Sequence, residues 1–242
     1  MFRIFIKELN SFLDSLIAYV IIGIFLISIG LLTWVFPETS VLEYGFADMG
    51  TLFNLGPYVF MFLIPAITMR SFSEERKSGT LELLLTKPLH DWQIIGGKFL
   101  AGFVIVLFSL LPTLLYYYSI YQLGSPVGNI DSAGTMGSYI GLLLLGAAFT
   151  SVGVFASSIT ENQVIAFVIA VFLSFILYQG LTSFANIDVW GTFSNEIEQL
   201  GIMYHYDALS RGLIDSRNVI YFFSVIALLL MSTNLVLGSR RW

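Results

Sequence analysis

Residues 132–187 read SAGTMGSYIGLLLLGAAFTSVGVFASSITENQVIAFVIAVFLSFILYQGLTSFANI and contain a single charged residue, Glu161. An α-helix rises about 1.5 Å per residue, so about 20 apolar residues cross a hydrocarbon core about 30 Å thick. Each uncharged stretch beside Glu161 is long enough for one crossing, and residues 160–163 leave room only for a short turn. This part of the sequence therefore predicts two antiparallel transmembrane helices.

The rest of the chain repeats this pattern. The predicted spans, all free of Asp, Glu, Lys and Arg, are residues 15–36, 51–69, 99–121, 137–159, 164–184 and 220–238. Only 11% of the 242 residues are charged, whereas a soluble domain carries about 25%. The first run is too long for the apolar region of a signal peptide, so we expect it to be retained. We predict one all-α integral membrane domain over residues 1–242, surrounded by the lipid bilayer.

The basic residues predict the orientation of the six spans. An even number of spans puts both termini on one side, together with the loop between the second and third spans. That side collects nine of the eleven Lys and Arg residues: Arg3, Lys7, Arg70, Arg76, Lys77, Lys87, Lys98, Arg240 and Arg241. Because short cytoplasmic loops carry the excess of Lys and Arg, we expect both termini and the 70–98 loop in the cytoplasm.

That loop carries the most informative motif, residues 70–88, RSFSEERKSGTLELLLTKP. Gly79 suits the left-handed conformation that follows the last turn of a helix, so it predicts a helix stop. Thr80 then suits the N-cap of a second, short helix, with Glu82 in the first turn where a carboxylate is favourable. Pro88 ends that helix, since the residue before a proline avoids the helical conformation.

The short helix is amphipathic, because Leu81, Leu84 and Leu85 fall at helical spacing on one face. A helix of about two turns is not stable alone in water, so this apolar stripe needs a partner. Two interpretations are open. The stripe lies on lipid headgroups or on the base of the bundle, or it docks into a groove of a cytoplasmic protein.

The run 73–89, SEERKSGTLELLLTKPL, resembles the signature of ABC-2-type transporter permeases. The resemblance implies that the short helix is a coupling helix seated against a separate cytoplasmic ABC ATPase, and that the chain is a permease subunit in the bacterial cytoplasmic (inner) membrane. It also implies a second permease copy or paralogue, and partly inserted external helices before the sixth span. Segments 158–167 and 210–222 most resemble the gliding-motility-associated permease subunit of Bacteroidetes, which implies a role in gliding.

The resemblance also implies roles for individual residues. The predicted ATPase-docking set is Glu74, Glu75, Arg76, Lys77, Gly79, Thr80, Leu81, Glu82, Leu84 and Leu85. In this set the four charged residues 74–77 make polar contacts, Gly79 and Thr80 shape the turn, and the leucines fill a groove of the ATPase.

The sequence predicts no catalytic, cofactor or metal site. A Walker A motif is absent, so we expect ATP and Mg²⁺ on the partner ATPase rather than on this non-catalytic chain. There is no cysteine, and the two histidines, His90 and His205, are expected on opposite sides of the membrane. We expect no nucleic-acid partner.

The polar residues within the spans leave alternatives open. Asn54 and Gln179 line a substrate path or form interhelical hydrogen bonds. The windows contain no ionisable residue, which argues against an ion-coupled secondary transporter, since such proteins place ionisable groups inside the bundle. That transporter class and an ATPase-coupled membrane anchor with a mechanical or assembly role remain the rival hypotheses.

Glycine and proline predict packing details. Gly137 and Gly141 form a G-x-x-x-G pair, which allows close helix approach either within the subunit or at a dimer seam. Pro57, Pro65 and Pro112 are expected to kink the second and third spans.

Overall fold

The computed structural model describes residues 1–81, 90–187, 193–212 and 214–239, and those residues form helices and connecting turns with no strand. The helices are α1 (Phe2–Leu13), α2 (Leu16–Trp34), α3 (Val41–Tyr44), α4 (Gly50–Thr68), α5 (Arg70–Lys77), α7 (Asp91–Leu110), α8 (Thr113–Leu123), α9 (Ser132–Ile159), α10 (Gln163–Phe175), the π-helix η1 (Ile176–Gly180), α11 (Leu181–Ala185), α12 (Ser194–Glu198), α13 (Ile202–Ser210) and α14 (Ser216–Gly238).

Six helical segments of the described chain are long and apolar enough to cross a membrane, which confirms the predicted number of spans. They are Leu16–Trp34, Gly50–Lys77, Asp91–Leu123, Ser132–Ile159, Gln163–Ala185 and Ser216–Gly238. The second and third segments are longer than the predicted windows and include charged residues. Lys98, which lies just outside the third predicted window, belongs to the helix of the third segment and has 1% of its surface exposed.

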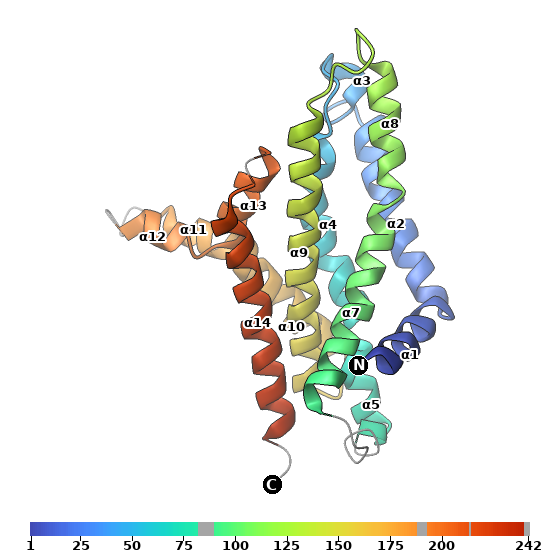
Figure 1. The fold of residues 1–242 in the computed structure, drawn as a ribbon, viewed down its shortest axis with the longest axis vertical. Coiled ribbons are helices and arrows are strands. Elements are labelled where there is room, and N and C mark those ends of the chain that lie inside the picture. The colour runs from blue at the N-terminus through green and yellow to red at the C-terminus, as the bar shows by residue number, and fades with distance from the viewer. Residues whose placement is uncertain (82–89, 188–192, 213, 240–242) are drawn as a thin grey trace.

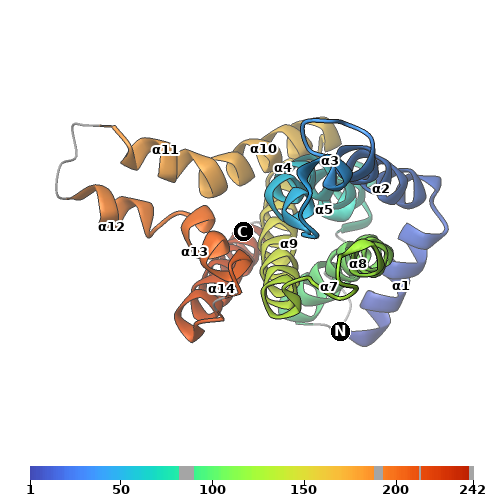
Figure 2. The same ribbon diagram turned by 90° about the horizontal axis from the view of Figure 1, so that it is seen from above.

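Helix α9 is the central element of the bundle, with α4, α7, α10, α13 and α14 packed around it (Figures 1 and 2). Its small residues permit this arrangement, because neighbouring helices approach most closely where no Cβ intervenes. A Cβ at Gly146 would lie 2.6 Å from the Val106 side chain, and one at Gly153 would collide with Thr68. Close packing against α7 and α4 therefore depends on glycine at these positions.

Gly153→Val is expected to lower the free energy of unfolding by about 2 kcal/mol, since overpacking a tight helix contact forces the two backbones apart. The measurement is the apparent unfolding midpoint in detergent. Gly23→Val is the matched control, because a Cβ there meets nothing within 4 Å. Equal midpoints for the two variants would contradict the proposed contact between α9 and α4.

The G-x-x-x-G pair packs within the chain. A Cβ at Gly137 would lie 2.8 Å from the Cα of Gly212, and one at Gly141 would lie 3.0 Å from the Cβ of Leu209. Between them, the Ser138 hydroxyl donates to the Ser210 carbonyl at 2.7 Å. The end of α13 therefore covers both glycines and packs beside the first turns of α9.

The third span is broken, as its proline predicts. Helix α7 ends at Leu110, α8 begins at Thr113, and Pro112 lies between them. Helix α4, in contrast, continues through Pro57 and Pro65 and is followed directly by α5 after Met69.

The N-terminus, α5 and the end of α14 lie at the same end of the bundle, which we call the base (Figure 1). One buried apolar cluster joins them. It consists of Ile4, Phe72, Leu81, Ile94, Ile95, Val154 and Leu237. The predicted common side of both termini and the 70–98 loop agrees with this arrangement, and its assignment to the cytoplasm stays a prediction.

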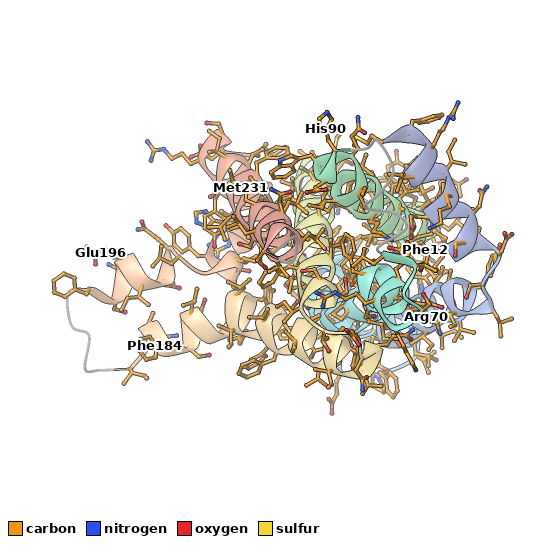
Figure 3. The ribbon with its side chains drawn as sticks, turned by 90° about the horizontal axis from the view of Figure 1, so that it is seen from below. Phe12, Arg70, His90, Phe184, Glu196 and Met231 are labelled. Atoms are coloured by element: carbon orange, nitrogen blue, oxygen red, sulfur yellow. The ribbon has the colours of Figure 1, made fainter. Side chains whose placement is uncertain are left out.

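Helices α11 and α12 form an arm that projects sideways from the bundle (Figures 1 and 2). In the view from below, Phe184 and Glu196 lie on this arm, far from Phe12 and Arg70 (Figure 3). Helices α12 and α13 lie between the fifth and sixth segments, where the resemblance implies additional helices, and their partial insertion into the membrane stays a prediction.

Candidate functional site

The turn at the end of α5 contains Gly79 in the conformation that the sequence predicts, and the N-cap role of Thr80 stays a prediction because the helix it would cap lies largely outside the described residues. Arg76 and Lys77 occupy the last turn of α5, where basic side chains complement the helix dipole. Gly79 then adopts a φ of 70°, the left-handed conformation in which glycine has no steric cost. The Thr80 hydroxyl donates to the Glu75 backbone carbonyl at 3.3 Å, and the Ser78 hydroxyl donates to the Glu74 backbone carbonyl at 2.9 Å.

The predicted ATPase-docking residues differ in exposure. The exposed members, which we call the basal tip, are Glu74, Lys77, Gly79 and Thr80. Three members, Glu82, Leu84 and Leu85, lie outside the described residues. Leu81 is only 7% exposed and packs in the basal cluster with Ile4 and Ile94. At least the first leucine of the stripe therefore contacts the base of its own bundle.

Glu75 and Arg76 also point into the chain rather than into solvent. Arg76 is 8% exposed. The Glu75 carboxylate forms ion pairs with Lys7 and Lys98 at 3.1 Å and 3.0 Å. These two residues are therefore less accessible to a partner protein than Glu74 and Lys77.

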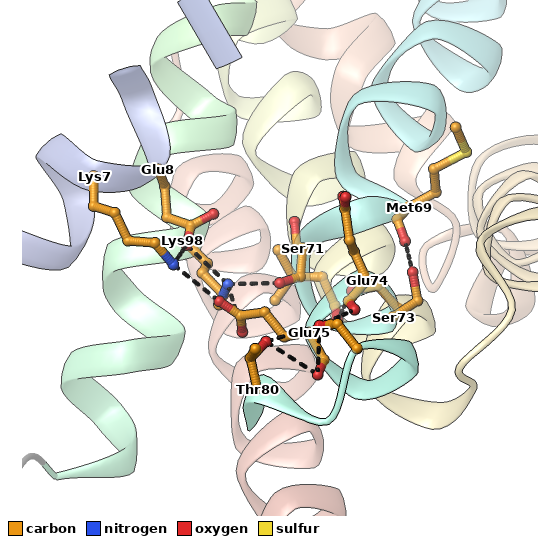
Figure 4. A network of polar contacts seen from close by, with 12 residues as sticks. Lys7, Glu8, Met69, Ser71, Ser73, Glu74, Glu75, Thr80 and Lys98 are labelled. Atoms are coloured by element: carbon orange, nitrogen blue, oxygen red, sulfur yellow. Dashed lines mark hydrogen bonds and ion pairs between the residues drawn. The ribbon is translucent and has the colours of Figure 1, made fainter. Parts of the chain in front are cut away.

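Lys98 is the centre of a buried ion cluster at the base, formed by Lys7, Glu8, Glu75 and Lys98 (Figure 4). The Lys98 ammonium lies 3.0 Å from Glu8 Oε1 and 3.0 Å from Glu75 Oε2, and it donates to the Ser71 carbonyl at 2.6 Å. It also lies 5.0 Å from the centre of the Phe72 ring, within cation–π range. The cluster connects α1, α5 and α7.

The charges of the cluster balance, since two carboxylates face two ammonium groups. This balance matters because an unpaired buried charge is very costly, whereas a paired and hydrogen-bonded one is tolerated. Burial lowers the pKa of Lys7, but the Glu8 and Glu75 carboxylates outweigh it and raise that pKa above its ordinary value. The cluster therefore favours the charged form of Lys7.

Sequence reasoning missed this cluster because it did not predict α1. A signal was present in Gly97, which precedes Lys98. A Cβ at Gly97 would lie 2.9 Å from Ile4 Cγ2, so glycine lets α1 lie directly on α7. That close approach places Glu8 beside Lys98.

The part of α4 that lies away from the base lines a second candidate site, which we call the outer cleft for that position. This cavity of about 530 Å³ lies between α4, η1 and α13. Its lining residues are Asn54, Leu55, Tyr58, Tyr178, Met203, Tyr206, Asp207, Ser210 and Arg211. Of the two substrate-path candidates, Asn54 lines the cleft, and Gln179 accepts a hydrogen bond from the Tyr58 hydroxyl at 3.0 Å. An interhelical hydrogen bond is thus confirmed for Gln179, and its role in a substrate path stays a prediction.

Comparison with known protein families agrees with this all-helical fold. A family model described as "ABC-2 family transporter protein" matches residues 44–238. The chain belongs to this ABC-2 family. Together with the six apolar helices, family membership makes it a multi-pass membrane protein. The matched residues include the basal tip, Lys98 and the outer cleft, whereas α1 and α2 precede the matched segment.

Individual relatives are similar over a shorter stretch. The probable multidrug ABC transporter permease YbhR of Escherichia coli (strain K12) is 31% identical over 128 residues, which are 51% of this chain and 33% of that protein. The protein of the same name from Escherichia coli O157:H7 gives the same values. The matched part thus spans about a third of the length of these relatives. Their descriptions refer to drug transport, and the link to gliding motility stays a prediction.

Proposed function

We propose that this chain is the permease subunit of an ATP-driven transporter in the bacterial cytoplasmic (inner) membrane. It couples ATP hydrolysis on a separate ABC ATPase, which holds ATP and Mg²⁺, to movement of a substrate. The observation that carries the proposal is the basal tip, an exposed polar turn at the same end of the bundle as α1 and the end of α14. The excess of Lys and Arg at this end supports a cytoplasmic position, where an ATPase can dock.

The fold offers a direct connection between the docking region and the outer cleft. Helices α4 and α5 together run from the cleft to the tip, and their combined length of 28 residues corresponds to about 42 Å at 1.5 Å per residue. A tilt imposed on α5 would therefore move Asn54 and Tyr58 at the other end. A second permease copy or paralogue completes the transport path, with substrate moving between the two bundles.

Two features support transport over the rival hypotheses. The matched relative carries the description of a multidrug permease, which favours a transported substrate over a purely mechanical anchor. The one deeply buried ammonium in the described spans, that of Lys98, is paired at the base. A structural ion pair of this kind does not by itself provide the ion pathway that a secondary transporter needs.

The test is co-purification with an ATPase. A gentle-detergent pull-down of the wild-type chain is expected to recover a protein with Walker motifs. The double variant Glu74→Arg/Lys77→Glu is expected to reduce that recovery about fivefold, since rim charges set association more than folding. Glu43→Arg, an equally exposed site on α3 at the other end of the bundle, is the matched control. Recovery of no ATPase with the wild-type chain would refute the proposal.

A further inference from the structure

Three tyrosines and two charged residues line the outer cleft, namely Tyr58, Tyr178, Tyr206, Asp207 and Arg211. Tyr58 and Tyr178 meet edge to face with ring centres 5.7 Å apart, and Tyr178 and Tyr206 lie 6.2 Å apart. Tyr178 thus stands between the other two rings. Met203 completes an apolar, polarisable lining.

Hydrogen bonds fix these rings in place. The Tyr206 hydroxyl donates to the Phe53 carbonyl at 2.6 Å, which ties α13 to α4. The Tyr58 hydroxyl donates to Gln179 at 3.0 Å, which ties α4 to η1. A π-helix such as η1 inserts an extra residue in the turn and is frequent at functional sites. The cleft therefore has preformed walls, as small-molecule sites generally do.

Asp207 supplies the one carboxylate among the residues that line the cleft. It is half-buried, and within the described part of the chain its carboxylate makes no ion pair. Arg211, one helical turn later, is exposed at the rim. Burial and the Glu198 carboxylate raise the pKa of Asp207 above its ordinary value, although Arg211 opposes this rise. The carboxylate is thus partly desolvated and accessible to a ligand cation from the cleft.

We propose that the outer cleft binds a hydrophobic organic cation, with Asp207 as the counter-ion and the ring of Tyr58, which is 38% exposed, as the cation–π partner. Tyr178 and Tyr206 are 2% and 1% exposed, so they support the Tyr58 ring from behind. Aromatic faces attract organic cations, and the attraction grows where water is excluded. A volume of about 530 Å³ is within the range of small-ligand sites. The proposal names a substrate class for the transporter and so rests on the proposed function.

Substitutions of the two charged residues in the cleft are expected to change the affinity for a cation in opposite directions. The probe is radiolabelled tetraphenylphosphonium, a permanent hydrophobic cation, and the full chain is held in lipid nanodiscs for a scintillation-proximity binding assay. Asp207→Asn is expected to weaken binding about tenfold, because the counter-ion is lost from a partly desolvated site. Arg211→Gln is expected to strengthen binding about threefold, because a competing positive charge is removed.

Further variants separate the contribution of the Tyr58 ring from general packing. Tyr58→Phe keeps the ring and is expected to bind within about twofold of the wild type, whereas Tyr58→Leu is expected to weaken binding about fivefold. Glu43→Gln removes a carboxylate on α3, outside the residues that line the cleft, and should leave binding unchanged. Tetraphenylborate, an anion of the same shape, should show the reverse order for Asp207→Asn and Arg211→Gln.

The outcomes distinguish this inference from the proposed function. If the ATPase co-purifies but tetraphenylphosphonium binds equally to the wild type, Asp207→Asn and Arg211→Gln, the cation site is refuted and the permease role stands. If binding depends on Asp207 but no ATPase is recovered, the cation site stands and the coupled transporter is refuted.

Discussion

Lys98→Met is expected to lower the free energy of unfolding by about 3 kcal/mol, because it removes the shared partner of two largely buried carboxylates. The Lys98 side chain is 1% exposed, and those of Glu8 and Glu75 are 11% and 15% exposed. Without the Lys98 ammonium, the two carboxylates would lie close together, and Lys7 would be the one remaining member of the cluster that pairs with them. The measurement is unfolding by SDS in mixed micelles, followed by tryptophan fluorescence.

Two further variants test the cause of that loss. The triple variant Lys98→Met/Glu8→Gln/Glu75→Gln is expected to recover more than half of the lost stability, since it removes the charges that Lys98→Met leaves unpaired. Lys7→Met is expected to cost less than about 1 kcal/mol, because its side chain is 60% exposed and solvent screens the pair. If the triple variant is no more stable than Lys98→Met, lost packing rather than unpaired charge is the cause.

Leu84→Asp is expected to abolish ATPase-coupled activity of the reconstituted complex. The sequence places Leu84 on the apolar face of the short helix after Gly79, and a carboxylate on such a face cannot enter an apolar groove without a large desolvation cost. The measurement is substrate-stimulated ATP hydrolysis together with ATPase co-purification from membranes that contain equal amounts of the two chains.

The control for this prediction is Leu42→Asp, an exposed leucine on α3 at the opposite end of the bundle. It should leave hydrolysis and co-purification at wild-type levels. Because Leu81 packs on the chain's own base, Leu84→Asp could instead act by loosening that base. A lowered unfolding midpoint with an unchanged yield of active ATPase would therefore contradict docking by Leu84.

Hydropathy predicts the number of spans well because the hydrocarbon core of a bilayer favours apolar side chains along the whole length of a crossing helix. The turn at Glu161, the break at Pro112 and the left-handed Gly79 follow from local rules, and the structure has all three. Charged residues border the second predicted window at its end and the third at its start, and in the structure the helices continue past those charges into the base.

The candidate sites were less predictable because they depend on contacts between distant segments. Glu75 and Arg76 read as exposed docking residues in a charged run, and only the position of α1 explains the ion pairs of Glu75. The hydrogen-bond acceptors of Lys98 are the Glu8 carboxylate, which is 90 positions away in the sequence, and the Ser71 carbonyl, which is 27 positions away. In the outer cleft, Tyr58, Tyr178 and Asp207 come from three separate segments, and none has a local pattern that links it to the others.

The break at Pro112 divides the third span into two halves with different attachments. The half nearer the base, α7, is attached to the base through Lys98. In the other half, α8, the Tyr116 hydroxyl donates to the Leu26 carbonyl, and the Tyr117 hydroxyl bonds the Ser132 hydroxyl. A helix interrupted in this way bends more readily than a continuous one. We therefore expect the third span to bend near Pro112 when α7 moves with the base, while α8 keeps its contacts with Leu26 and Ser132.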